Sequence, residues 1–107
     1  GAIAAGDIGR HFPPSDPQWK DAPSSVFASH AARLVREAGW RIDNLDATIV
    51  LEKPKLATHI DAIRLSVAAI LGVDAALVSV KAKTSEGVNA AGAGDAIEAQ
   101  AVVLLER

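Results

Sequence analysis

Leu45-Asp46-Ala47-Thr48-Ile49-Val50-Leu51-Glu52 alternates along its whole length. The odd-numbered residues are all apolar and fall on one side of an extended chain, whereas the residues between them are mostly polar. This period of two predicts a β-strand over residues 45–52 with one apolar face. Pro54 then ends the strand, because proline has no N–H to donate to a neighbouring strand.

Helical periodicity flanks this strand on both sides. Apolar residues recur at three- and four-residue spacing over residues 24–38, which predicts a helix that Gly39 ends. A second apolar stripe over residues 60–71 predicts a helix that Gly72 ends. Residues 1–5 read as the last turn of another helix, closed by the glycine that follows.

Two more strands are expected toward the C-terminus. Residues 78–82 alternate, and residues 95–105 carry an apolar side chain at every odd position from Ile97 onward. A strand–helix–strand unit favours a parallel pair with a right-handed crossover, and the hairpin of the last two strands favours an antiparallel neighbour. The sequence therefore predicts an α+β fold, in which helices cover one face of a mixed β-sheet.

The other face of this sheet is expected to meet a partner subunit. Val102 and Leu104 place apolar side chains on the side of the last strand that faces away from the helices. A partly apolar face with no helix left to cover it is typical of a subunit interface. A three-fold axis could bury three such faces together, so we expect a homotrimer.

Composition excludes several classes of protein. The 107 residues suffice for one domain with a small core, so residues 1–107 are expected to form a single domain. A net charge of −2 argues against nucleic acid as a partner, and no apolar run is long enough to span a bilayer. The absence of cysteine excludes disulfides and thiolate metal sites and fits a reducing cytoplasm.

The segment that carries most chemical information is Gly6-Asp7-Ile8-Gly9-Arg10-His11-Phe12-Pro13-Pro14-Ser15-Asp16-Pro17. Its glycines and prolines restrict or specialise the backbone, so we expect a loop of fixed shape that holds two carboxylates. Three further segments are informative about function. They are Asn44-Leu45-Asp46-Ala47-Thr48-Ile49-Val50, Pro54-Lys55-Leu56 with His59-Ile60, and Val78-Ser79-Val80-Lys81-Ala82-Lys83-Thr84-Ser85-Glu86.

Together, the four segments resemble the signature blocks of the 2-C-methyl-D-erythritol 2,4-cyclodiphosphate synthase family, in the family's order and spacing. The resemblance implies an enzyme of non-mevalonate isoprenoid biosynthesis, a phosphorus–oxygen lyase of the bacterial cytoplasm. Its substrate would be 4-diphosphocytidyl-2-C-methyl-D-erythritol 2-phosphate, a cytidine diphosphate-linked small molecule, and its products the cyclic diphosphate and CMP. It also implies a homotrimer with sites between subunits.

The resemblance assigns roles to individual residues. Thr84 and Glu86 would be catalytic, Thr84 by bracing a phosphate and Glu86 by binding Mg²⁺ or Mn²⁺. The erythritol part of the substrate would contact residues 6–17, which we call the first loop. The cytidine and the phosphates would contact the segments around Pro54 and Thr84. The substrate-binding residues implied in this way are Asp7, Gly9, Phe12, Asp16, Pro54, Lys55, Leu56, Ala57, Lys83 and Thr84.

Each role has a plainer alternative. Glu86 could be a solvated carboxylate in a turn, although a carboxylate beside phosphate oxygens is the usual way in which proteins hold Mg²⁺. Asp7 could simply hold a turn together, and Lys55 could be a surface charge. The three histidines, His11, His30 and His59, are not spaced as ligands on one helix face, and His30 is expected to be packed or partly packed.

Family members carry an N-terminal segment that is not among residues 1–107, and the resemblance places the ligands of a catalytic zinc there. We therefore expect the chain to be incomplete at its N-terminus and residues 1–107 alone to be inactive. Two other functions remain open. One is a non-catalytic module that binds cytidine nucleotides, and the other is a trimerising module, possibly the tail of a bifunctional chain.

Overall fold

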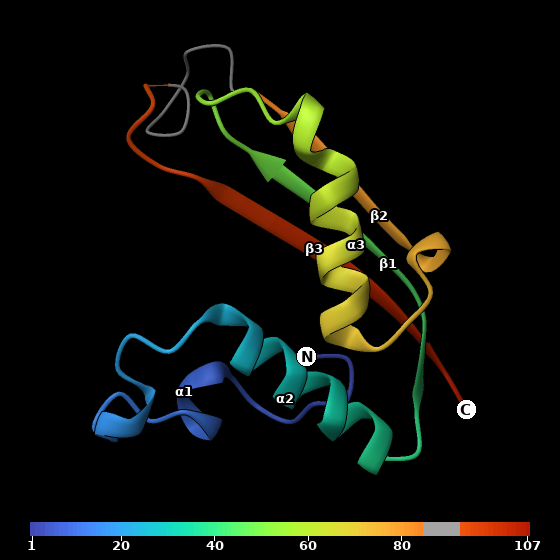
Figure 1. The fold of residues 1–107 in the computed structure, drawn as a ribbon. Coiled ribbons are helices and arrows are strands. Elements are labelled where there is room, and N and C mark those ends of the chain that lie inside the picture. The colour runs from blue at the N-terminus through green and yellow to red at the C-terminus, as the bar shows by residue number, and fades with distance from the viewer. Residues whose placement is uncertain (85–92) are drawn as a thin grey trace.

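A computed structural model of the chain describes residues 1–84 and 93–107 and places three strands in one mixed sheet (Figure 1). The strands are β1 (Arg41–Val50), β2 (Val78–Lys83) and β3 (Glu98–Glu106), in the order β2-β1-β3. The helices are α1 (Ile8–His11), α2 (Ser24–Glu37) and α3 (Ile60–Leu71), with 3₁₀ turns η1 (Pro17–Trp19), η2 (Ala57–His59) and η3 (Ala75–Leu77).

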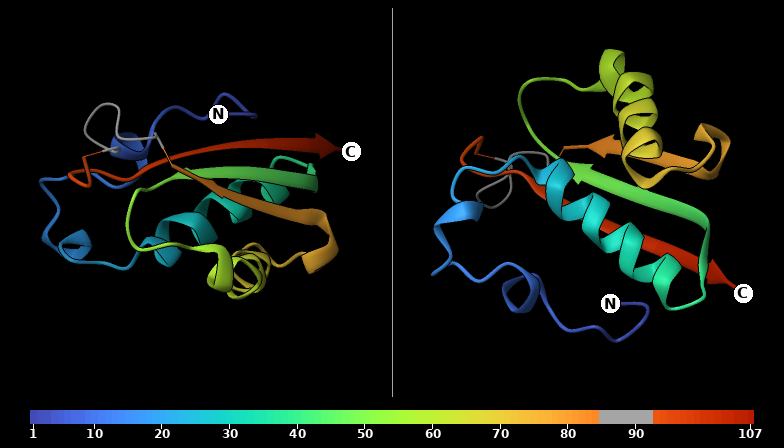
Figure 2. Two further views of the ribbon diagram at one scale, coloured as in Figure 1. Left: turned by 90° about the horizontal axis from the view of Figure 1, so that it is seen from above. Right: turned by 60° about the horizontal axis from the view of Figure 1, so that its bottom comes forward.

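Helices α2 and α3 lie on the same side of the sheet (Figure 2). The core forms where α3 meets the sheet, around the buried residues Ala68, Val78 and Val80. The predicted apolar face of the central strand packs here, because Leu45, Ala47 and Ile49 all contact this cluster. The expected α+β architecture, with a mixed sheet and helices on one face, is confirmed.

Two of the predicted helix ends, at Gly39 and Gly72, are confirmed. Gly72 follows α3 in a left-handed conformation, with φ of 70°, and its N–H reaches back to the carbonyls of Ala68 and Ala69. Gly39 has φ of 85° just beyond α2. Glycine adopts such angles without the steric cost that a Cβ atom would bring, so it stops a helix at a defined residue.

Three predictions about the elements are wrong. Residues 1–5 form a turn, not a helix end, and Ala4 N–H bonds to the carbonyl of Gly1 at 2.9 Å. The central strand begins at Arg41 and ends at Val50, so the predicted range of 45–52 is displaced toward the C-terminus. The last strand begins at Glu98, not at residue 95, and Ile97 lies outside it with an exposed side chain.

The expected hairpin between the last two strands is also wrong. β1 pairs in parallel with β2, as the strand–helix–strand unit predicts, but β3 pairs antiparallel with β1 and not with β2. β3 therefore lies along the edge of β1 that β2 leaves free. As a result β1 lies at the centre of the sheet, with an edge strand on each side.

The sheet face opposite the helices carries exposed apolar residues. Val102 is 73% exposed and Leu104 is 54% exposed on β3. The register places Val102 beside Asp46 and Leu104 beside Asn44, on the side that faces away from the core cluster. No helix of residues 1–84 and 93–107 is long and apolar enough to cross a membrane.

Candidate functional site

A cavity of about 470 Å³ lies where β1 and β2 end and α3 begins, and we call it the strand-end cavity. The ends of the two strands are tied together by a 3.0 Å bond from the N–H of Leu51 to the carbonyl of Lys83. The turn η2 closes the opposite wall, where the N–H of His59 bonds to the carbonyl of Leu56 at 2.8 Å. Its volume is in the range of small-molecule sites.

The lining of the strand-end cavity combines apolar walls with a few polar groups. Its residues are Leu51, Lys55, Leu56, Ala57, Thr58, Ile60, Asp61, Ala82, Lys83 and Thr84. Asp61 is held by Arg64 at 3.0 Å, so its negative charge is partly compensated within α3. Ammonium, hydroxyl and backbone N–H donors beside an apolar wall suit a ligand with a flat ring and an anionic group.

Five of the predicted substrate-binding residues meet in this cavity, namely Lys55, Leu56, Ala57, Lys83 and Thr84. Pro54 lies in the same loop but does not line the cavity. The register places Lys83 beside Val50, so alternation along β2 sends its side chain to the same sheet face as Lys81. Lys83 therefore offers the cavity its backbone more readily than its ammonium group.

Five lining residues were not predicted as site residues: Leu51, Thr58, Ile60, Asp61 and Ala82. Leu51 and Ala82 could have been found, because alternation along the predicted strands points both side chains toward the helix face. Ile60 lies in one of the segments that resemble the family signature, whereas Asp61 carried no such signal and became part of the wall only because α3 packs on the sheet. The predicted metal ligand Glu86 lies outside the described residues, 1–84 and 93–107.

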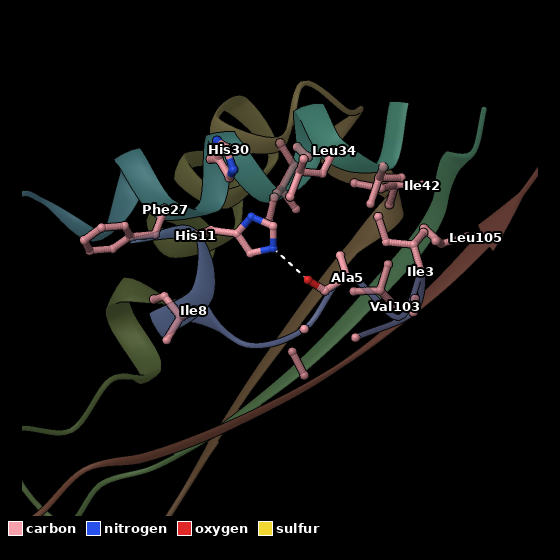
Figure 3. Close-up of a pocket in the computed structure, with 18 of the residues that line it drawn as sticks. Ile3, Ala5, Ile8, His11, Phe27, His30, Leu34, Ile42, Val103 and Leu105 are labelled. Carbon is pink, nitrogen blue, oxygen red and sulfur yellow. Dashed lines mark hydrogen bonds between the residues drawn. The ribbon is translucent and has the colours of Figure 1, made fainter. Parts of the chain in front are cut away.

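The other predicted substrate-binding residues lie at a different place in the fold. Asp7 and Phe12 line a second cavity of about 600 Å³, which lies between the N-terminal segment, α2 and β3. We call it the apolar cavity, since its walls are mostly aliphatic and aromatic side chains (Figure 3). The two cavities have no lining residue in common, so one chain does not bring the two predicted groups together.

The two carboxylates of the first loop accept hydrogen bonds from residues in the loop or next to it. Asp7 caps α1, and its Oδ1 accepts a 3.0 Å bond from the N–H of Arg10. Asp16 caps η1 and accepts two bonds from Gln18, 3.1 Å from the backbone N–H and 2.6 Å from the side-chain amide. Gly9 lies within α1. These bonds give the loop the fixed shape that its composition predicts.

Among the described residues, no group of three or more His, Cys, Asp or Glu side chains is placed to hold a metal ion. His11 and His30 have ring centroids 5.5 Å apart, but the Nε2 of His11 lies 2.7 Å from the carbonyl oxygen of Ala5. Arg33 donates to His30 Nδ1 at 2.8 Å. The described residues by themselves therefore do not form the zinc or magnesium site that the resemblance implies.

The fold and its strand-end cavity define a class: a small α+β protein with a cavity of small-molecule size where two parallel strands end. A sequence model of the YgbB family matches residues 1–106, and the chain belongs to this family. It is 61% identical over 102 residues to the bifunctional enzyme IspD/IspF of Novosphingobium aromaticivorans, with 95% of this chain and 26% of that protein covered.

Two other similarities agree with this assignment. The chain is 52% identical, over all 107 residues, to 2-C-methyl-D-erythritol 2,4-cyclodiphosphate synthase of Xanthomonas oryzae pv. oryzae, of which it covers 66%. IspF of Plasmodium falciparum, solved as a CDP complex, superimposes with a TM-score of 0.85 at 31% identity, with 98% of this chain and 62% of that chain covered. The chain thus spans between about a quarter and about two thirds of the length of these relatives.

Proposed function

We propose that residues 1–107 belong to an enzyme that converts 4-diphosphocytidyl-2-C-methyl-D-erythritol 2-phosphate into 2-C-methyl-D-erythritol 2,4-cyclodiphosphate and CMP. The observation that carries the proposal is the strand-end cavity, in which residues matched to the family's cytidine loop meet Thr84 at the end of β2. Membership of the YgbB family and a structural neighbour solved with CDP support it.

The proposed reaction needs no nucleophile from the protein. An oxygen of the substrate's 2-phosphate attacks the β-phosphorus, and the bond from the β-phosphorus to the oxygen that bridges to the α-phosphorus breaks. CMP leaves with that bridging oxygen and its electron pair, so no oxidant or reductant is required. The protein has to fold the substrate so that the attacking oxygen and the phosphorus meet, which is catalysis by positioning.

The described residues would divide this task. Pro54, Lys55, Leu56 and Ala57 would hold the cytidine, Lys83 and Thr84 the phosphates, and Asp7, Gly9, Phe12 and Asp16 the erythritol. Glu86 would hold Mg²⁺ or Mn²⁺, which would neutralise phosphate charge, and zinc would be bound by residues outside this chain. These roles remain proposals, as does the cytoplasmic location.

The separation of the two cavities supports a homotrimer. A single chain keeps the first loop and the strand-end cavity apart, so a site that uses both needs two copies of the chain. The exposed apolar face at Val102 and Leu104 offers a surface on which copies could meet. We propose a trimer in which the first loop of one copy faces the strand-end cavity of the next.

Nucleotide titration of the wild-type protein and two matched variants tests the proposal. Ala82 and Ala99 flank Ile49 from opposite sides in the register, but only Ala82 lines the strand-end cavity. Ala82→Phe should fill the cavity and weaken CDP binding by roughly tenfold or more, equivalent to about 1.4 kcal/mol. Ala99→Phe should bind CDP as the wild type does.

Three outcomes decide between the proposal and its rivals. CDP binding that Ala82→Phe weakens, together with CMP release from the substrate by the full-length protein, supports the enzyme. CDP binding without turnover indicates a cytidine-nucleotide module. Absence of CDP binding from a folded wild-type trimer indicates a trimerising module.

A further inference from the structure

The first loop is fixed to the rest of the fold by an aromatic cluster with Phe12 at its centre. The Phe12 ring lies 4.8 Å from Trp19, 4.6 Å from Phe27 and 4.8 Å from His30, between ring centroids. All three contacts are edge-to-face, the geometry that aromatic quadrupoles favour. We call Phe12, Trp19, Phe27 and His30 the aromatic anchor.

The anchor joins three parts of the chain. Phe12 caps the C-terminal end of α1, with its N–H bonded to the carbonyl of Ile8 at 2.9 Å, while Trp19 ends η1. Phe27 and His30 belong to α2, one helical turn apart. The ring of Phe12 thus couples both ends of the loop that carries Asp7 and Asp16 to a long helix packed on the sheet.

Two polar contacts reinforce the anchor at its edge. Arg33 Nη2 donates to His30 Nδ1 at 2.8 Å, which holds the imidazole in one orientation along α2. His11 Nε2 lies 2.7 Å from the carbonyl oxygen of Ala5, and this bond holds the segment before α1 against the same region (Figure 3). Inside the loop, Asp7 and Asp16 have their own partners, so the loop is stiff and the anchor sets its position.

We propose that Phe12 is a positioning residue for the reaction, which acts by holding the first loop in place through the aromatic anchor. The proposal rests on the proposed function, in which this loop meets the erythritol part of the substrate. Phe12 also lines the apolar cavity, and its edge contacts with three other rings fix where its ring lies. Phe27 and His30, which lie on α2, contribute to this positioning as members of the same anchor.

The proposal predicts that a change on α2 has the same effect as a change in the loop. Phe12→Leu removes the central ring, and Phe27→Leu removes one of its partners without touching the loop. Both should reduce kcat/KM, by as much as roughly 10²-fold if the loop shifts by about 1 Å. Phe12→Tyr keeps the ring and should retain most activity. CDP affinity at the strand-end cavity should stay within about twofold for all three variants, because the two cavities share no residue.

Fluorine NMR of the full-length protein labelled with 5-fluorotryptophan reports on the anchor directly. The Trp19 signal is assigned by its loss in Trp19→Phe, and the Trp40 signal is the internal control, since Trp40 lies under Arg107, with its ring centroid 4.2 Å from the guanidinium carbon. Phe12→Leu and Phe27→Leu should move the Trp19 signal toward that of free fluorotryptophan and leave Trp40 unchanged. Leu65→Ala, at a side chain 58% exposed on α3, should move neither.

Several results would overturn the proposal. If Phe12→Leu reduced kcat/KM while Phe27→Leu had wild-type activity and an unmoved Trp19 signal, Phe12 would act through contact with the substrate and not through the anchor. If neither variant changed activity, the anchor would have no role in positioning. Should Phe27→Leu fail to fold, Phe12→Leu is compared with Phe12→Tyr, and kcat/KM and the Trp19 signal decide. A wild type that neither binds CDP nor turns over substrate would refute the proposed function, whereas a Trp19 signal unmoved by Phe12→Leu would refute the anchor.

Discussion

Lys81 and Asp46 form an ion pair across the two parallel strands, with 2.8 Å between Nζ and Oδ2. The pair lies on the sheet face opposite the core cluster, and both side chains are about half exposed. The hydrogen bond from Lys81 is the main reason why the pKa of Asp46 is lowered, and partial desolvation opposes it. Val102 is the register partner of Asp46 on β3, so the ion pair and the exposed apolar residues share one surface.

The lowered pKa of Asp46 predicts a contribution to stability that depends on pH. Its stabilising effect is fully present above the ordinary pKa of 3.8 and is lost as pH falls through the lower pKa of the folded state. In Asp46→Asn this contribution is absent at every pH. The difference in free energy of unfolding between wild type and Asp46→Asn should therefore shrink between about pH 5 and pH 2.

Urea unfolding of both proteins across this range measures the difference. Asp43→Asn is a suitable control, because Asp43 lies on the same strand without a salt bridge to a described residue. A difference that is independent of pH would contradict the role of the Lys81–Asp46 pair.

The exposed apolar residues of the same face predict the oligomeric state. Val102→Lys and Leu104→Lys would place charges in a trimer interface, where they would be desolvated without partners. Each variant should convert a stable trimer into monomers at micromolar concentration, as measured by light scattering. Leu65→Lys makes the same change at a residue 58% exposed on α3, and the trimer should persist. A wild-type protein that is a monomer under these conditions would defeat the proposed assembly.

The contact between α3 and the sheet predicts the response of the core to overpacking. Ala68 is 4% exposed and packs against Val78 and Val80. Ala68→Leu adds volume that this space does not hold, so it should reduce the free energy of unfolding by about 1–3 kcal/mol. Ala69→Leu, at the adjacent exposed position, should change it by no more than about 0.5 kcal/mol. Equal effects of the two variants in chemical denaturation would show that α3 is packed differently.

Glu86, which lies outside the described residues, remains the predicted ligand of Mg²⁺ or Mn²⁺. Glu86→Gln keeps the shape of the side chain and removes its charge. In the full-length enzyme we expect turnover to fall by roughly 10²-fold or more, by analogy with the removal of other groups that stabilise charge in a transition state. Fold and assembly should persist, as circular dichroism and light scattering would report. Wild-type turnover at ordinary Mg²⁺ concentrations would exclude Glu86 as the ligand.

Parts of the site could be predicted from the sequence, and the reason differs from residue to residue. Lys55, Leu56, Ala57 and Thr84 lie in short segments whose residues resemble a family signature, and the structure brings them to one cavity. The aromatic anchor carries no such signal, because Trp19 and Phe27 approach Phe12 only after the loop folds back on α2. Lys83 was predicted from a motif, but a motif does not show to which face of the sheet a side chain points, and only the register of β2 shows this.

Local sequence was sufficient for the presence of the three strands, for helices α2 and α3, and for the ends of these two helices. The alternation around Ile49 and the glycines at positions 39 and 72 act through the backbone of a few neighbouring residues, so they hold in any fold. The start of β1 did not follow from alternation, because a register irregularity between Ile42 and Asn44 breaks the period of two. Tertiary structure alone decided that β3 pairs with β1 and not with β2, since this choice depends on contacts between segments far apart in the sequence. It also decided that the first loop and the strand-end cavity lie apart, a relationship between distant segments that no local pattern encodes.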